Sequence, residues 1–104
     1  MVRQDINKLL GKALENLIKQ GFFNSADIKK MLQTDTVSVC KDQQFGDYAS
    51  NAAMRLAGAA KKNPMEIAAK IKEELEKSAK AKKIFAKIEV AAPGFVNFYL
   101  TNDY

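Results

Sequence analysis

The sequence contains no histidine, no tryptophan and a single cysteine, Cys40. Without histidine, the chain can build neither a Ser-His-Asp or Cys-His nucleophile nor a zinc site with a histidine ligand. A single cysteine excludes an intrachain disulfide and is typical of a reducing compartment. We therefore expect no metal site and a cytoplasmic location.

Glycine is also sparse, and its five residues are scattered one to a segment. No Gly-rich loop that could cradle a phosphate is present. Two carboxylate pairs remain as candidates for acid–base chemistry, Asp42 with Asp47 and Glu73 with Glu74. Their surroundings are typical of a polar turn and a helix surface. We therefore do not expect the chain by itself to be an enzyme or to bind a cofactor.

Long apolar runs are missing as well, because none approaches the roughly 20 residues of a membrane span. The N-terminus has the pattern of an amphipathic helix rather than that of a signal peptide. The length suits one domain, residues 1–104, and 47% hydrophobic with 28% charged residues is ordinary for a globular protein. We expect one soluble domain without a membrane partner.

The first predicted element is an amphipathic helix of about four turns that ends near Gly21. Ser25 is suited to cap a short helical turn over residues 26–32. The apolar stripe of the first helix recurs at helical spacing, at Ile6, Leu9, Leu10, Ala13, Leu14, Leu17 and Ile18.

Two short strands are expected next. Residues 36–40 alternate, and a polar turn leads from them to a very short strand around Phe45. Asp47 is then placed to cap a second helix, since a carboxylate accepts from the free N–H groups of a first turn. The core face of that helix is rich in alanine: Ala49, Ala52, Ala53, Leu56, Ala57 and Ala60.

The second half of the chain restarts a helix and closes with a hairpin. Asn63 is a helix cap, and Pro64 takes the first helical position, where its missing N–H costs nothing. The apolar stripe that follows contains Ile67, Ala68, Ile71 and Leu75. Residues 77–83 then predict a basic loop, and residues 85–91 and 95–100 predict two strands joined through a Pro-Gly turn.

This order of helix, two strands, helix and two strands predicts an α+β fold. It is a two-layer sandwich with a mostly antiparallel sheet and the helices on one face. The apolar faces of the strands must then pack on the helices, which leaves the other sheet face uncovered. We expect Phe85, Lys87 and Glu89 on that uncovered face.

The closing strand has two different faces. Val96, Phe98 and Leu100 point one way, whereas the opposite side is lined by Phe95, Asn97 and Tyr99. Aromatic rings can stack on nucleotide bases, and an asparagine offers a donor and an acceptor to a base edge. Aromatic residues on strands more often pack in a core or between domains, so both interpretations stay open at this point.

The positive charge is concentrated in one part of the sequence. Nine lysines and four glutamates lie within residues 61–87, which accounts for the whole net charge of +5. Such a segment is either a solvated helix surface or a contact for the phosphates of a polyanion. The candidates for contact with a nucleic-acid backbone are Lys61, Lys62, Lys80, Lys82, Lys83 and Lys87.

Two sequence blocks resemble the N-terminal domain of bacterial-type arginyl-tRNA synthetases. They are residues 45–54 (FGDYASNAAM) and 92–100 (APGFVNFYL), with Asn63-Pro64 between them. The resemblance covers nearly the whole chain. It implies an accessory domain that contacts the D-loop at the outer corner of tRNA-Arg, with base recognition by Phe95 and Asn97. By the same comparison, six positions are structural: Gly46, Asp47, Tyr48, Asn51, Pro93 and Gly94.

The resemblance also implies a larger parent protein. The catalytic domain of that family carries the class I motifs and binds ATP, and none of its motifs occurs in this chain. We therefore read the chain as one domain of an ATP-dependent arginine–tRNA ligase rather than as a free-standing protein. Its expected partners are tRNA-Arg and the catalytic domain of the same polypeptide. The alternative is an interaction module that packs on a catalytic domain without reading a base.

Overall fold

The computed structural model describes residues 2–23, 35–41, 44 and 46–101. Ser25 and the helical turn expected over 26–32 lie outside these residues, as does Phe45. The elements, in order, are α1 (Val2–Lys19), β1 (Val37–Val39), β2 (Tyr48–Ser50), α3 (Ala52–Ala60), α4 (Pro64–Glu76), α5 (Ala79–Ile84), β3 (Phe85–Ala91) and β4 (Phe95–Leu100).

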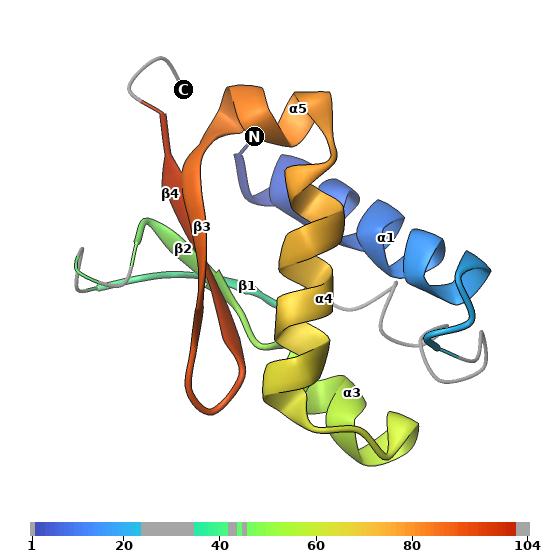
Figure 1. Cartoon of the computed structure of the whole chain (residues 1–104). Helices are drawn as coiled ribbons and strands as arrows, with labels where there is room; N and C mark the ends of the chain where they lie inside the picture. The colour runs from blue at the N-terminus through green and yellow to red at the C-terminus, as the bar shows by residue number, and fades with distance from the viewer. Residues whose placement is uncertain (1, 24–34, 42–43, 45, 102–104) are drawn as a thin grey trace.

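The strands form one antiparallel sheet in the order β1-β2-β4-β3. The helices lie together on one side of this sheet, and within the described part of the chain no helix covers its other side (Figure 1). This confirms the predicted two-layer α+β sandwich. The centre of the sheet is formed by strands that are far apart in the sequence. There β4 lies between β2, from the first half of the chain, and β3, from the second half.

The core lies between the helices and the inner face of the sheet. The predicted stripe of α1 is buried except for Ile18, which is half-buried, and Ile67, Ile71 and Leu75 of α4 are also enclosed. Phe98 reaches this core from β4 with no exposed surface, and its ring lies 4.8 Å from that of Phe85. The apolar spacing of α1 and α4 therefore predicted their buried faces correctly.

The start of α4 agrees with its sequence signal. The Asn63 side chain accepts a hydrogen bond from the backbone N–H of Met65 at 2.8 Å, and Pro64 is the first helical residue. The prediction of a basic loop over residues 77–83 is wrong, because α5 occupies most of this segment. Ser78 caps α5 by accepting from the N–H of Ala81 at 3.3 Å, and Ala81 and Ile84 of this helix are buried.

The segment around Asp47 differs from its prediction. Residues 48–50 form β2, so Ala49 belongs to a strand rather than to the face of a helix. The helix α3 begins later, with Asn51 at its N-cap position and the Ser50 hydroxyl accepting from the N–H of Ala52 at 3.1 Å. Asp47 is not a helix cap, because its carboxylate is bonded to the sheet instead.

The start of β3 also departs from simple alternation. The pairing with β4 shifts between Phe85 and Lys87, which places Phe85 in the core and leaves Ala86 exposed. A shift of one residue moves a side chain to the opposite face of a sheet. The expectation that Phe85 lies on the uncovered face is therefore wrong, whereas Lys87 and Glu89 are exposed as expected.

Candidate nucleic-acid interface

The face of β4 that points away from the helices carries Phe95, Asn97 and Tyr99. Their neighbours Val96 and Phe98 have no exposed surface, as the alternation predicted. The three outer residues differ in exposure: Phe95 is 37% exposed, Asn97 only 4%, and Tyr99 lies between them. The sequence did not predict that the Phe95 ring would be exposed while Asn97 beside it is enclosed.

Asn97 is enclosed because it lies at the floor of a depression in the sheet. Its partners across the sheet are Ala49 on β2 and Glu89 on β3. A depression of about 370 Å³ opens beside the asparagine, and we call it the Asn97 hollow. The described residues that line it are Cys40, Lys41, Ala49, Ala91, Ala92, Phe95 and Asn97.

The lining of the Asn97 hollow is mostly apolar, with a few polar groups. Burial raises the pKa of the Cys40 thiol, and the negative charge of Asp47 raises it further. The thiol therefore stays neutral at pH 7 and adds no negative charge to the hollow. A mostly apolar cavity with a few polar groups is the usual form of a site for a small ligand.

Tyr99 and Lys87 are bound to other residues of this face. The Tyr99 hydroxyl donates to the backbone carbonyl of Gln44 at 2.7 Å. The Lys87 ammonium lies 4.4 Å from the centre of the Tyr99 ring and 3.0 Å from the Glu89 carboxylate. The hydrogen bond to Glu89 raises the pKa of Lys87. Tyr99 thus bonds β4 to Gln44, a contact that no sequence signal indicated.

Gly46 and Asp47, just before β2, contact β4, the strand that carries Phe95 and Asn97. Gly46 has a φ of +96°, and a Cβ placed there would lie 2.7 Å from the carbonyl oxygen of Phe98. The next N–H, that of Asp47, donates to the same carbonyl at 2.8 Å. Only glycine allows the backbone to approach β4 this closely in this conformation.

Tyr48 and Asn51 lie at the two ends of β2. Tyr48 is half-buried and packs against the core. The backbone N–H of Asn51 donates to the carbonyl of Thr36 at 3.2 Å, whereas its side-chain Oδ1 is buried without a hydrogen-bond partner among the described residues. Asn51 lies where the sheet passes into α3, and neither residue is among the described lining of the Asn97 hollow.

Pro93 and Gly94 form the turn just before Phe95. The N–H of Gly94 donates to the carbonyl of Ala91 at 2.9 Å. A Cβ on Gly94 would lie 2.8 Å from the Cβ of Pro64, so the turn packs tightly against the first residue of α4. This contact fixes the position from which β4 begins.

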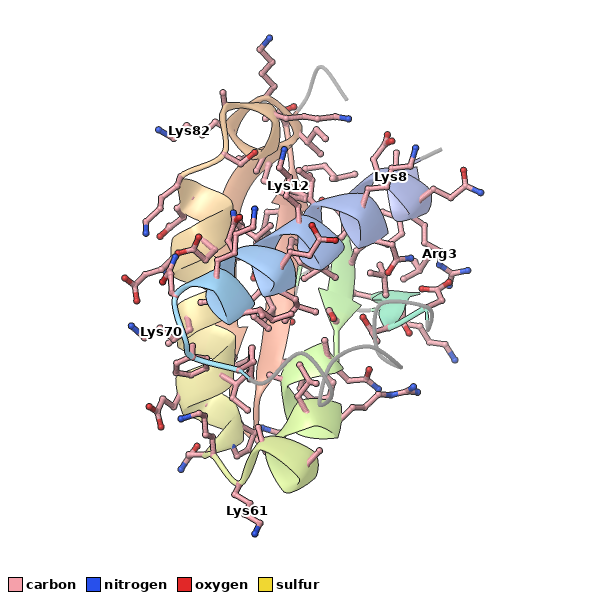
Figure 2. All side chains as sticks on the ribbon, turned by 90° about the vertical axis from the view of Figure 1, so that its right-hand side faces the viewer. Arg3, Lys8, Lys12, Lys61, Lys70 and Lys82 are labelled. Atoms are coloured by element: carbon pink, nitrogen blue, oxygen red, sulfur yellow. The ribbon has the colours of Figure 1, made fainter. Side chains whose placement is uncertain are left out.

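The candidate backbone-binding lysines do not form a single surface. Lys61 and Lys82 lie at opposite ends of the domain (Figure 2). The ammonium of Lys62 lies 4.7 Å from the centre of the Phe22 ring, and Lys80 and Lys83 are exposed on α5 with Lys82.

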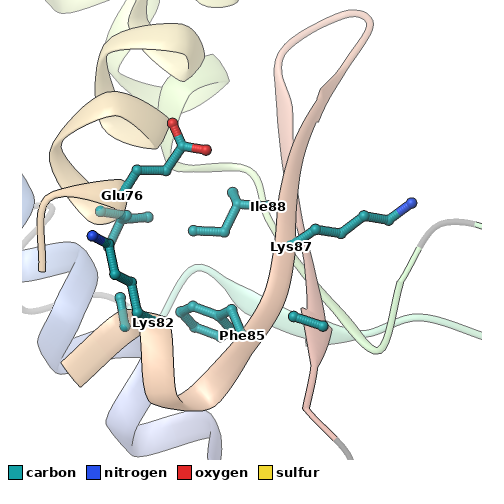
Figure 3. A pocket seen from close by; sticks show the side chains of 8 residues that line it. Glu76, Lys82, Phe85, Lys87 and Ile88 are labelled. Atoms are coloured by element: carbon teal, nitrogen blue, oxygen red, sulfur yellow. The ribbon is translucent and has the colours of Figure 1, made fainter. Parts of the chain in front are cut away.

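A groove separates Lys82 from Lys87. Its volume is about 220 Å³, and its lining includes Glu76, Phe85 and Ile88. Lys87 points away from Lys82 and toward the uncovered face of the sheet (Figure 3). Of the candidate lysines, Lys87 is therefore the one placed on the same face as Asn97.

The structure describes both members of only one of the two carboxylate pairs considered in the sequence. Asp42 lies outside the described residues, and Glu73 and Glu74 differ in environment, with side chains 61% and 6% exposed. Glu74 is not surface charge, since it accepts from the Gln20 amide at 2.9 Å and the Lys77 ammonium at 3.0 Å. The Gln20 bond, followed by that of Lys77, lowers the pKa of Glu74.

Neither a metal centre nor a membrane span is found in the described part of the chain. No group of three or more acidic, cysteine or histidine side chains there is arranged to hold a metal ion. None of the described helices has the length and apolar character needed to cross a bilayer.

Comparison with known proteins places this fold in a family. A profile described as "Arginyl tRNA synthetase N terminal domain" matches residues 4–100. The arginine–tRNA ligase of Listeria monocytogenes serotype 4a is 38% identical over 97 residues, covering 93% of this chain and 16% of the relative. That of Shewanella oneidensis is 39% identical over 102 residues, covering 98% and 16%. That of Staphylococcus carnosus is 52% identical over 68 residues, covering 65% and 12%.

The fold and the site together define a small α+β domain with one uncovered sheet face. The chain belongs to the family of arginyl-tRNA synthetase N-terminal domains. It spans about one sixth of the length of the Listeria monocytogenes and Shewanella oneidensis ligases, at 16% of each.

Proposed function

We propose that this chain is the tRNA-binding accessory domain of an arginine–tRNA ligase and contacts the D-loop at the outer corner of tRNA-Arg. The observation that most supports this proposal is that the exposed ring of Phe95 and the enclosed side chain of Asn97 lie together on the uncovered face of the sheet. Phe95 stacks on an unpaired base, and Asn97 contacts the edge of that base.

The lysines supply affinity without sequence preference. Lys61 lies at one end of the domain and Lys82 at the other. These two lysines contact phosphates, as do Lys62 next to Lys61, Lys80 and Lys83 on α5, and Lys87 on β3. Phosphate contacts position a nucleic acid, whereas base contacts give specificity. The catalytic domain of the same polypeptide binds ATP and attaches arginine, in the cytoplasm, while this domain supports that reaction by holding the tRNA.

Titration of tRNA-Arg into the chain at two salt concentrations tests the phosphate contacts. We expect the affinity to fall steeply as salt rises, because each neutralised phosphate releases counterions. The variants Lys82→Gln and Lys61→Gln each remove one charge from one end of the domain, so a smaller salt slope reports which end touches the RNA. An affinity that is indifferent to salt would contradict the phosphate contacts.

Base recognition is tested separately with Asn97→Ala and Phe95→Ala. Stacking on one aromatic ring is worth about 1–3 kcal/mol, so Phe95→Ala should weaken binding by about that amount. Asn97→Ala should reduce the difference between intact tRNA-Arg and transcripts with a substituted D-loop base. Ala59→Leu on the exposed side of α3 is a matched control. Equal discrimination by Asn97→Ala and the unaltered chain would contradict base reading.

The alternative is an interaction module that packs on the catalytic domain. The apolar lining of the Asn97 hollow supports it, because that lining also suits a protein side chain. A titration followed by NMR separates the two functions. Shifts at Phe95 and Asn97 on addition of tRNA-Arg support tRNA binding. Shifts at these residues only on addition of the catalytic domain support the alternative.

A further inference from the structure

The Asn97 hollow exists because of small side chains on the strands beside Asn97. Ala49 lies directly across from Asn97 on β2, where paired Cβ atoms are about 4.5–5.5 Å apart. Its side chain is a single methyl group, so it leaves the asparagine amide uncovered on that side. On the other side, Ala91 pairs with Phe95 and also lines the hollow.

The neighbour of Asn97 on β3 is Glu89, and its carboxylate is held by residues outside the hollow. Glu89 pairs with Asn97, and an extended glutamate there could cover the amide. Its carboxylate is instead held 3.0 Å from the Lys87 ammonium and 3.5 Å from the Tyr99 hydroxyl. Glu89 is not among the described residues that line the hollow. The Lys87–Glu89–Tyr99 contacts therefore keep the hollow open.

The Asn97 side chain has an unused capacity for hydrogen bonding. The residue is only 4% exposed and lines the hollow, yet no hydrogen bond joins its side-chain amide to another described residue. Among the described residues, the one buried side-chain polar atom without a partner is Oδ1 of Asn51, so the Asn97 amide is open to the hollow and keeps its donor and acceptor for a ligand there. A ligand that enters the hollow and presents a donor and an acceptor would complete these bonds.

The shape and lining of the hollow limit what that ligand can be. Its volume of about 370 Å³ is at the small end of ligand sites, which begin at about 300 Å³. Ala91, Ala92 and Phe95 give it apolar walls suited to a flat ring. Among its described lining residues, Lys41 alone carries a charge, and Lys41 is exposed.

We propose that Ala49 sets the size of the Asn97 hollow to one unpaired nucleobase, and that Lys41 at its rim contacts the phosphate of the same nucleotide. This inference rests on the proposed tRNA-binding function and assigns two residues to it. The base enters with its hydrogen-bonding edge toward Asn97 and one face against Phe95. Any longer side chain at position 49 fills the space that the base needs.

Enlarging residue 49 tests this inference. The probe is a tRNA-Arg transcript, either intact or with one D-loop nucleotide made abasic, titrated into the ¹⁵N-labelled chain. We expect one abasic position to weaken binding to the unaltered chain at least tenfold. Ala49→Leu and the strand-compatible Ala49→Val should bind the intact transcript as weakly as the abasic one, and the Asn97 side-chain amide signal should no longer shift. Ala59→Leu, which adds the same bulk at an exposed position of α3, should behave as the unaltered chain.

The outcomes separate this inference from the function on which it rests. If Ala49→Val binds the intact transcript as tightly as the unaltered chain, with the Asn97 amide shift retained, the role of Ala49 is wrong and tRNA binding stands. If the unaltered chain binds no transcript, both are wrong. Lys41→Gln should lower the slope of log affinity against log salt by about one, as expected for one lost phosphate contact. An unchanged slope would overturn the role of Lys41.

Discussion

The carboxylate of Asp47 accepts a hydrogen bond from the backbone N–H of Leu100 at 2.8 Å, although 53 positions separate the two residues. The backbone N–H of Asp47 donates to the carbonyl of Phe98 at 2.8 Å, so one residue holds β4 through two bonds. These bonds keep β4 in register with β2. The register in turn places Ala49 beside Asn97 and so forms the proposed base site.

Removing the Asp47 carboxylate should loosen this connection. Asp47→Ala leaves the N–H of Leu100 without its partner, and an unpaired, partly buried donor costs about 1–3 kcal/mol. We expect the free energy of unfolding in urea to fall by that amount. Asp47→Asn keeps an acceptor oxygen at the same position and should lose less. Equal losses in both variants would show that the hydrogen bond is not the reason.

Two glycines should respond in opposite directions to the same substitution. Gly46→Ala places a Cβ 2.7 Å from the Phe98 carbonyl oxygen at a φ of +96°, and such strained positions cost about 1–3 kcal/mol. Gly58 lies in α3, and a Cβ placed there would have nothing within 4 Å. Gly58→Ala should therefore stabilise by about 0.5–1 kcal/mol, because alanine favours the helix. Urea unfolding of both variants measures these changes.

Glu74 should make the stability of the domain depend on pH. Hydrogen bonds from Gln20 and then Lys77 lower its pKa in the folded chain below the ordinary value of 4.5. A lowered folded pKa means that the carboxylate contributes stability above the unfolded pKa and loses it as pH falls through the folded pKa. Glu74→Gln should thus destabilise the domain at pH 7, and the difference from the unaltered chain should shrink as the pH falls below about 4.5.

Urea unfolding at pH 7 and at pH 3 checks this dependence. Glu73→Gln is the matched control, since the Glu73 side chain is 61% exposed and its only described ion pair, with Lys70, spans 4.0 Å. We expect that variant to change stability by less than about 0.5 kcal/mol. A difference for Glu74→Gln that stays constant from pH 7 to pH 3 would contradict the assigned cause.

Phe95 and Phe98 should separate RNA binding from folding. Phe98 has no exposed surface and packs on Phe85, so Phe98→Ala should cost about 3–5 kcal/mol of unfolding free energy. Phe95 is 37% exposed, and Phe95→Ala should cost much less stability while weakening binding to tRNA-Arg. The pair of measurements is urea unfolding and a tRNA titration. A Phe95→Ala variant as unstable as Phe98→Ala would indicate a structural role for both rings.

Much of the fold was predictable because its signals are local. The buried stripes of α1 and α4 follow from spacing along one helix, and the cap at Asn63 depends on residues within one turn. The failures have a different cause. Asp47 is a residue type that often caps helices. In the structure it is hydrogen-bonded instead to a carbonyl and an N–H of β4, which lie across the sheet. Phe85 was misplaced because a register shift is set by pairing rather than by sequence alternation.

The candidate site divides in the same way. The sequence by itself determined that Phe95, Asn97 and Tyr99 share one face of β4, because successive side chains on any strand alternate. Only the tertiary structure decided what surrounds them. Pairing of β4 with strands from both halves of the chain brings Ala49 and Glu89 to either side of Asn97 and forms the Asn97 hollow. The helix α4 lies between Lys61 and Lys82 in the chain, and its length places these two lysines of one charged segment at opposite ends of the domain.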